Sequence, residues 1–158
     1  MNMHVPIQQE KRRRMTMKPR ISLITLGVAD VAAATDFYIK VGLQKSGQGN
    51  ERVSFFQLSG GLVLALWSRT DLAEDARVED RGTGFGGMSL AYNAASPLEV
   101  DKLIAAFVAA GARLLKAPDK TFWGGYSGYV ADPDNHVWEI AHNPFWELDE
   151  TGGITLPA

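Results

Sequence analysis

Cysteine is absent from this 158-residue chain, and histidine occurs three times. Without cysteine the chain has no disulfide, no thiolate zinc site and no cysteine nucleophile. No apolar run approaches the roughly 20 residues that a membrane-spanning helix needs. The first residues are polar and basic, with no hydrophobic segment of the kind that starts a secretory signal. A cytoplasmic protein with no membrane partner is therefore expected.

Basic charge is concentrated at the start of the chain. Residues 1–20 carry six lysines and arginines against one glutamate, a net of +5 that leaves −7 on residues 21–158. A folded part this acidic repels phosphate backbones, so we expect it to have no nucleic-acid partner. Residues 1–20 are expected to be a disordered basic extension. Contact of Lys11–Arg14 with nucleic acid or anionic lipid is the alternative for that extension.

Residues 21–67 have the pattern of one strand–helix–strands unit. Alternating apolar residues predict half-buried strands, and apolar residues at helical spacing predict a helix after the first strand. Asp30 is placed to cap the start of this helix, and Gly42 to end it. A glycine-rich turn then leads to the remaining strands. The strands are predicted at Ile21–Val28, Arg52–Leu58 and Leu62–Trp67.

The same order recurs in residues 87–142, and this recurrence is stronger evidence than any single segment. Ser96, Pro97 and Glu99 predict a capping box with proline at the first helical position, and Gly111 ends the helix. Gly111 lies 69 residues after Gly42, its counterpart in the first unit. The strands are predicted at Gly87–Tyr92, Ala112–Leu115, Tyr126–Ala131 and Val137–Ala141.

The two units, residues 21–67 and 87–142, are predicted to be βαβββ modules of an α+β domain. Residues 68–86 between them are highly charged and then glycine-rich, which is typical of a linker, with a short helix expected at Asp71–Ala76. Residues 143–158 have little periodicity and are expected to form a C-terminal tail.

Short motifs in both units carry a family resemblance. Leu26–Asp30 leads into Phe37-Tyr38 and Val41–Leu43, and Asp132–Ile140 reads as a turn that enters a strand with a central glutamate. In these features residues 21–142 resemble the vicinal oxygen chelate superfamily, which contains glyoxalase I, the extradiol dioxygenases and the bleomycin-resistance proteins. The resemblance implies a curved, mostly antiparallel sheet with a ligand in its concavity.

The resemblance also implies where a metal would bind. In metal-dependent members, histidine and glutamate side chains from four strands hold the ion. These four positions fall on Leu23, Ala65, Gly87 and Glu139. One carboxylate cannot hold a catalytic divalent ion, which needs about three protein ligands. His136 and His142 lie on the opposite face of a regular strand from Glu139, so we expect no metal and no cofactor.

Strand alternation predicts the lining of the concave pocket. Small residues on the concave face leave room for a ligand, and aromatic rings form its wall. The rings of Trp123 and Tyr126, separated by two glycines, either reach into this cleft or pack as ordinary core. Glu139 is predicted to be the main charged group, with a purely structural glutamate as the alternative. The predicted ligand-binding residues are Thr25, Trp67, Ser89, Trp123, Tyr126, Val137 and Glu139.

These residues support four hypotheses, in descending order. The first is a metal-free protein that binds a small cationic or hydroxylated organic molecule, for sequestration or resistance. The second is a metal-independent isomerase or lyase in which Glu139 is the general base. A divergent metal-dependent lyase or dioxygenase is third, because three of the four ligand positions are lost, and a structural dimerisation module is fourth. In each case a homodimer is expected, since pairing covers exposed strand edges.

Overall fold

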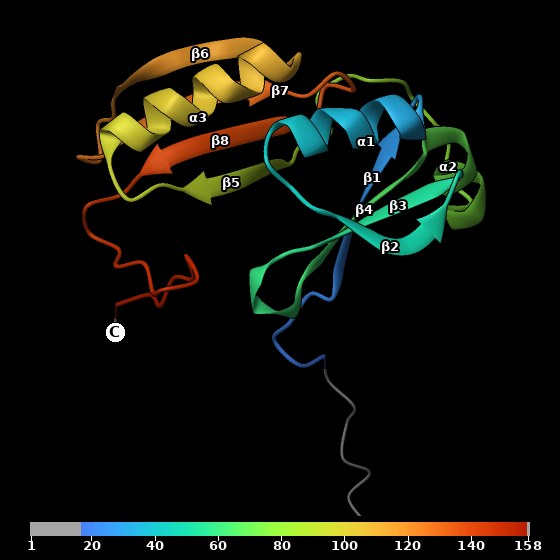
Figure 1. Ribbon diagram of the computed structural model, residues 1–158, viewed down its shortest axis with the longest axis horizontal. Coiled ribbons are helices and arrows are strands. Elements are labelled where there is room, and N and C mark those ends of the chain that lie inside the picture. Colours follow the sequence, from blue (N-terminus) through green and yellow to red (C-terminus); the bar gives the residue numbers. More distant parts are fainter. Residues whose placement is uncertain (1–16, 158) are drawn as a thin grey trace, which may run out of the picture.

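The computed structural model describes residues 17–157 (Figure 1). The first module contains β1 (Leu23–Val28), α1 (Val31–Lys40), β2 (Lys45–Asn50), β3 (Val53–Gln57) and β4 (Val63–Ser68). After α2 (Arg69–Ala76), the second module contains β5 (Ser89–Asn93), α3 (Pro97–Ala110), β6 (Arg113–Lys120), β7 (Tyr126–Ala131) and β8 (Val137–His142). The predicted α+β class with two βαβββ modules is confirmed. Most of the predicted basic extension lies outside the described residues.

Each module forms its own four-stranded sheet, and the two sheets have the same strand order. The orders are β1-β4-β3-β2 and β5-β8-β7-β6. The first and last strands of each module pair in parallel, and the other neighbours pair antiparallel. The sheets are thus mostly antiparallel, as predicted. Hydrogen bonding divides the eight strands of residues 17–157 into two sheets of equal size.

One strand was not predicted, and β6 extends to Lys120 where the sequence predicts a strand at Ala112–Leu115. The sequence predicts a glycine-rich turn where the structure has β2, a polar segment with two glycines, which strands disfavour. Pairing with β3 makes it an edge strand, and a bulge interrupts that pairing before Gly49. Gly49 has a φ of +99°, and a Cβ there would lie 2.5 Å from the carbonyl oxygen of Val53. Glycine is therefore needed for this strand to approach its neighbour.

The predicted helix ends are confirmed, with one difference in detail. The Asp30 carboxylate accepts a hydrogen bond from Ala33 N at 2.9 Å, and the Ser96 hydroxyl accepts one from Glu99 N at 3.2 Å. The Glu99 carboxylate, however, accepts from Ala95 N, one residue before the N-cap that a regular capping box uses. α3 has 14 residues and α1 has 10, so the second helix is about one turn longer.

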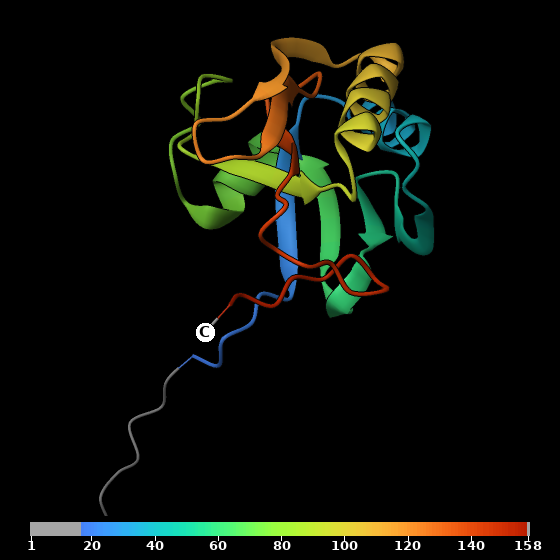
Figure 2. The same ribbon diagram turned by 90° about the vertical axis from the view of Figure 1, so that its left-hand side faces the viewer.

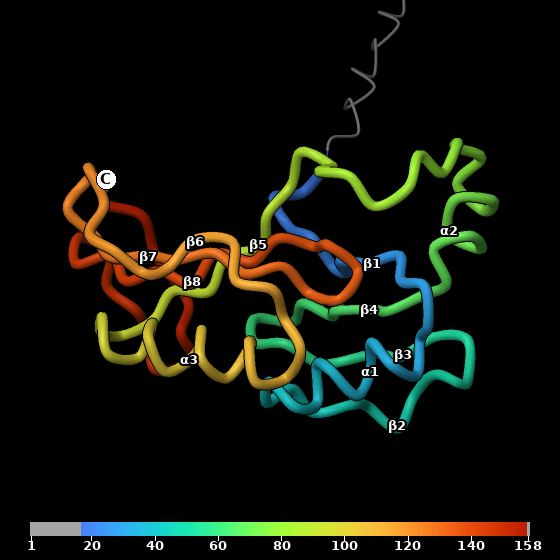
Figure 3. Tube along the Cα trace, turned by 90° about the horizontal axis from the view of Figure 1, so that it is seen from above, coloured from blue at the N-terminus to red at the C-terminus, as the bar shows by residue number. Residues whose placement is uncertain are grey.

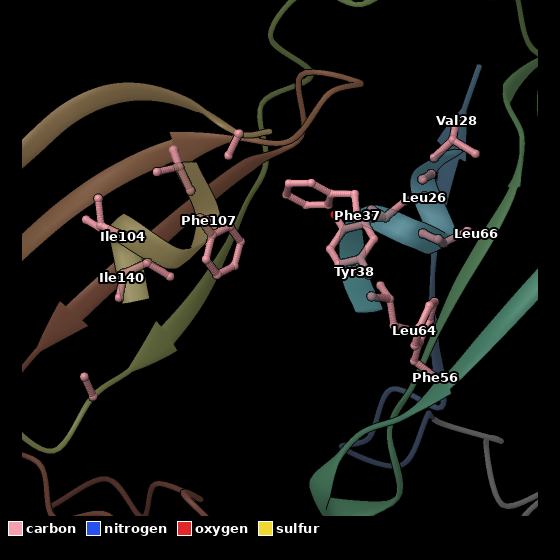
Figure 4. Packing of buried hydrophobic residues seen from close by; sticks show 14 of the residues in the cluster. Leu26, Val28, Phe37, Tyr38, Phe56, Leu64, Leu66, Ile104, Phe107 and Ile140 are labelled. Atoms are coloured by element: carbon pink, nitrogen blue, oxygen red, sulfur yellow. The ribbon is translucent and has the colours of Figure 1, made fainter. Parts of the chain in front are cut away.

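The two long helices lie on the same side of the sheets, and the segment after α2 runs along the other side (Figure 3). Aromatic side chains join the modules beneath the helices, as Figure 4 shows for Phe37 and Phe107. Their ring centroids are 6.1 Å apart, and Phe107 lies 5.8 Å from the ring of Trp138. Buried residues of both modules form one continuous core. The other side of each sheet, opposite α1 and α3, is called the helix-free face below, although the first residue of α2, Arg69, lies against Gly27 on the first sheet.

A buried carboxylate also ties the modules together. Asp132, in the turn before β8, is 3% exposed and accepts a hydrogen bond of 2.7 Å from the hydroxyl of Tyr38 in α1. The backbone N–H groups of Asp134 and His136 donate to the same carboxylate, and the His136 ring nitrogen Nδ1 lies 2.8 Å from it. Burial raises the pKa of Tyr38 well above its ordinary value, and the negative charge of Asp132 raises it further. The phenol therefore stays protonated as a donor.

Outside the modules, the C-terminal segment lies below the second sheet in the view of Figure 2 and passes in front of the first sheet. A backbone bridge between Leu148 and Ile154 closes a loop in this segment. Within the loop, the Asp149 carboxylate accepts hydrogen bonds from the backbone N–H groups of Thr151 and Gly153. Among residues 17–157, no helix combines the length and the apolar character that crossing a bilayer requires.

Replacing Tyr38 with phenylalanine should lower the free energy of unfolding by about 1.5–3 kcal/mol, since a buried carboxylate loses a donor. Urea denaturation measures the change. Tyr92→Phe is the matched control, because the Tyr92 hydroxyl is 3.3 Å from Glu99 at an exposed site. Its effect should stay within about 0.5 kcal/mol. Equal losses in the two variants would contradict a special role for the buried pair.

Candidate functional site

β8 sends alternate side chains to opposite faces of the second sheet. Trp138 and Ile140 pack in the core beneath α3. Val137, Glu139 and Ala141 lie on the helix-free face, in the strand that has neighbours on both sides. Glu139 is thus a partly buried carboxylate near the middle of this sheet face, on which Ala131 and Ala141 are buried.

The strand register extends a polar row across the whole sheet at Glu139. Tyr129 of β7 lies directly opposite Glu139 on one side, and Ala91 of β5 lies opposite on the other. Lys116 of the edge strand β6 lies opposite Tyr129. Because paired residues share a face and strands are about 4.8 Å apart, Lys116 is two strand spacings from Glu139, with Tyr129 between them. Beyond them, the methyl group of Ala91 leaves open space.

The electrostatics of this row favour a protonated Tyr129 phenol. Burial raises the pKa of Tyr129 above its usual value, and the charge of Glu139 raises it further. Within residues 17–157, Glu139 takes part in no ion pair. The row therefore presents a carboxylate acceptor whose charge no neighbouring cation neutralises, next to a hydroxyl that both donates and accepts.

The predicted binding residues are divided between the two sheets. On the helix-free face of the first sheet, Thr25 lies opposite Ala65, and Trp67 lies opposite Gly27. On the second sheet, Ser89 lies opposite Val137, two residues before the Ala91–Glu139 pair. The structure thus brings Ser89, Val137 and Glu139 together on one sheet. Thr25 and Trp67 form a separate group on the other.

Two of the predicted residues lie elsewhere. Tyr126 faces the α3 side of the second sheet, where its hydroxyl donates a 2.8 Å hydrogen bond to Asp101. It therefore does not join Glu139, because it is an odd number of residues from Tyr129 along the same strand. The Trp123 ring lies over Gly125, where an added Cβ would overlap it at 1.8 Å. Trp123 is held by the loop itself.

The internal repeat corrects one predicted position. Leu23 opens β1 opposite Val63, and Ser89 opens β5 opposite Val137 in the same arrangement. Ser89, and not Gly87, is therefore the counterpart of Leu23 in the second module. The sequence prediction began this strand at Gly87, whereas the structure begins it at Ser89. Gly87 precedes the strand and has a φ of +74°.

The corrected set still does not fit a divalent metal. Its members are Leu23, Ala65, Ser89 and Glu139. Two of them are aliphatic and one is a neutral hydroxyl, so a single strong ligand remains. In the part of the chain that the structure describes, no three histidine, aspartate or glutamate side chains come together as a metal-binding group.

A hollow of about 500 Å³ adjoins the helix-free face at Val137. It lies between the start of the second module and the glycine-rich segment after α2, which includes Arg81 and Phe85. Asn135 Nδ2 donates a 3.2 Å hydrogen bond to the Thr83 carbonyl and so ties this segment to the turn before β8. Glu139 does not line the hollow; it lies on the same face as Val137, about 7 Å further along the strand.

Sequence reasoning missed Lys116 and Tyr129 as members of the site. Tyr129 belongs to an aromatic cluster in the sequence. It lies two residues before Ala131, the last residue of its strand, so strand alternation predicts that the two side chains share a face. No sequence signal indicated Lys116, because two register irregularities in β6 shift the alternation of its side chains. Its position follows from the pairing alone.

Comparison with known proteins agrees with this architecture. Residues 20–140 match the family described as the Glyoxalase/Bleomycin resistance protein/Dioxygenase superfamily. A glyoxalase-related enzyme from Fulvimarina pelagi is 39% identical, with a TM-score of 0.82 over 89% of this chain and 100% of the other. A search of curated proteins found no match.

More distant solved structures have the same fold. A glyoxalase/bleomycin resistance protein/dioxygenase family enzyme from Burkholderia phytofirmans PsJN is 25% identical, with a TM-score of 0.66 over 77% of this chain and 96% of the other. Lactoylglutathione lyase from Agrobacterium tumefaciens is 24% identical, with a TM-score of 0.63 over 84% of this chain and 100% of the other. The latter likeness concerns the fold alone.

Replacing Glu139 with glutamine should lower the pKa of Tyr129 toward its usual value near 10, since a neighbouring negative charge is removed. Burial acts in both proteins, so the difference between them isolates the carboxylate. NMR titration of tyrosine ring signals against pH measures it. Glu147→Gln, at an exposed site in the C-terminal segment, is the control. An unchanged Tyr129 pKa in the Glu139 variant would show that the pair is not in contact.

Proposed function

Because this chain belongs to the Glyoxalase/Bleomycin resistance protein/Dioxygenase superfamily, we propose that it binds a small organic molecule in the cytoplasm without a metal. The site is the helix-free face of the second sheet, with Glu139 as the main charged contact. The ligand enters through the hollow beside the glycine-rich segment and reaches the carboxylate past Val137. Sequestration of such a molecule, as in resistance, is the use that this arrangement suits.

The observation that carries this proposal is the unneutralised, partly buried carboxylate of Glu139. A buried or half-buried charge is costly without a partner, and a ligand with an ammonium group or hydroxyls supplies one. Ala91 and Ser89 are small and exposed, so they leave room above the sheet. Tyr129 offers a second polar contact to the same ligand.

An enzymatic role is the second candidate, and the Tyr129–Glu139 pair favours it. Glu139 would act as general base on a carbon acid, and the Tyr129 hydroxyl would donate a hydrogen bond to the oxygen that becomes negative. The raised pKa of Tyr129, caused first by burial and then by Glu139, keeps the proton on the phenol while it donates this bond. Proton exchange from the substrate carbon into deuterated water distinguishes turnover from binding alone.

Glu139→Gln should weaken binding at least tenfold, about 1.4 kcal/mol, because it removes the charge and keeps the shape. A panel of organic cations and polyhydroxylated compounds identifies ligands by their effect on the melting temperature, and calorimetry gives the affinities. Glu147→Gln should retain the affinity of the native chain. Unchanged affinity together with a large fall in melting temperature would make Glu139 a structural residue.

We further propose that the chain forms a homodimer. β1 and β5 are edge strands, and Leu23, Met88 and Tyr92 on or beside them are about half exposed. Pairing of two chains would cover these edges and apolar side chains. Light scattering after size exclusion should give twice the 17.2 kDa chain mass at micromolar concentration. A mass of 17.2 kDa under those conditions would contradict the dimer.

A further inference from the structure

A second hollow, of about 370 Å³, lies on the α3 side of the second sheet, where α3 begins. Its lining consists of Pro97, Lys120, Thr121, Gly124, Gly125, Tyr126 and His142. Tyr126 and His142 alternate along their strands with the residues of the helix-free face. The sheet therefore separates this hollow from Glu139, and nothing in the proposed function uses it.

Three chemically active side chains form one row in this hollow. Tyr126 of β7 lies directly opposite Lys120 of β6 on one side and opposite His142 of β8 on the other. Two residues further along β7, at Gly128, α3 covers the sheet closely. A Cβ added to Gly128 would lie 2.5 Å from Ile104. Because the helix begins at Pro97, its first turn borders the Tyr126 row and leaves the space above it open.

The existing hydrogen bonds define what each of these groups still offers. His142 Nδ1 lies 3.1 Å from the Ala94 carbonyl oxygen, which can only accept, so Nδ1 carries the proton and Nε2 is left as an acceptor. The Tyr126 hydroxyl donates to Asp101, so its oxygen is left to accept. This bond, together with burial, raises the pKa of Tyr126 and keeps its proton in place. Lys120 takes part in no ion pair within residues 17–157.

The geometry points to a second binding site here, for a small carboxylic acid that carries a hydroxyl group at its far end. The carboxylate pairs with the Lys120 ammonium, and the hydroxyl donates to His142 Nε2. Pro97, the Gly124-Gly125 backbone and the Tyr126 ring form the apolar walls between these two ends. Lys120 and His142 are two strand spacings apart, about 10 Å at the backbone, with Tyr126 on the strand between them. A rigid ring with its two polar groups in para positions matches this separation.

The probe is 4-hydroxybenzoate, titrated into the full chain labelled with ¹⁵N. The expected result is saturable movement of the amide signals of Lys120, Thr121, Gly125 and Tyr126. Benzoate, which lacks the hydroxyl donor, should bind at least fivefold more weakly. Lys120→Gln should weaken 4-hydroxybenzoate at least tenfold. In His142→Phe, the advantage of 4-hydroxybenzoate over benzoate should disappear.

Lys40→Gln is the matched control, because Lys40 is an exposed lysine at the end of α1 in the other module. It should leave the affinity within twofold of the native chain. The site is overturned if Lys40→Gln and Lys120→Gln weaken binding equally, if the two acids bind equally well, or if no saturable shift occurs by 10 mM. The comparison of the two acids on the native chain decides the matter even if a variant fails to fold. Glu139 plays no part in this test, so its outcome is independent of the proposed function.

Discussion

The buried carboxylate of Asp132 is the contact on which the rest of the arrangement depends. It receives the Tyr38 hydroxyl from one module and two backbone N–H groups from its own turn, and it lies against the His136 ring. These bonds fix both the packing of α1 against the second module and the point at which β8 begins. Removing a single donor leaves a desolvated charge underpaired, so the turn and the module contact are stabilised together.

Both candidate sites follow from the register of β8. Glu139 and His142 are three residues apart, so their side chains lie on opposite faces of the sheet. A slip of one residue would exchange the two faces, bringing Glu139 under α3 and Trp138 into water. The large apolar side chains of Trp138 and Ile140 oppose such a slip. Core packing on one face thus fixes the positions of Glu139 and His142 on the two faces.

Sequence patterns predicted those parts of the fold in which local and tertiary preferences agree. The caps at Asp30 and Ser96 and the alternation around Glu139 are of this kind. β2 was missed because its composition is that of a turn, and pairing alone makes it a strand. The counterpart of Leu23 was misplaced because the strand was predicted to begin at Gly87, two residues before it does. The Lys116–Tyr129–Glu139 row depends on cross-strand register, which one strand's sequence does not contain.

The segment between α2 and β5 is attached to the rest of the chain by few contacts. It is held at a few exposed points, by Arg69 to Asp80 and to the Gly82 carbonyl, and by Asn135 to Thr83. Few of its side chains enter the core, and Phe85 is 78% exposed. Hydrogen exchange in such a segment proceeds by local opening at far lower free energy than global unfolding. One wall of the adjoining hollow can therefore open while the two modules stay packed against each other.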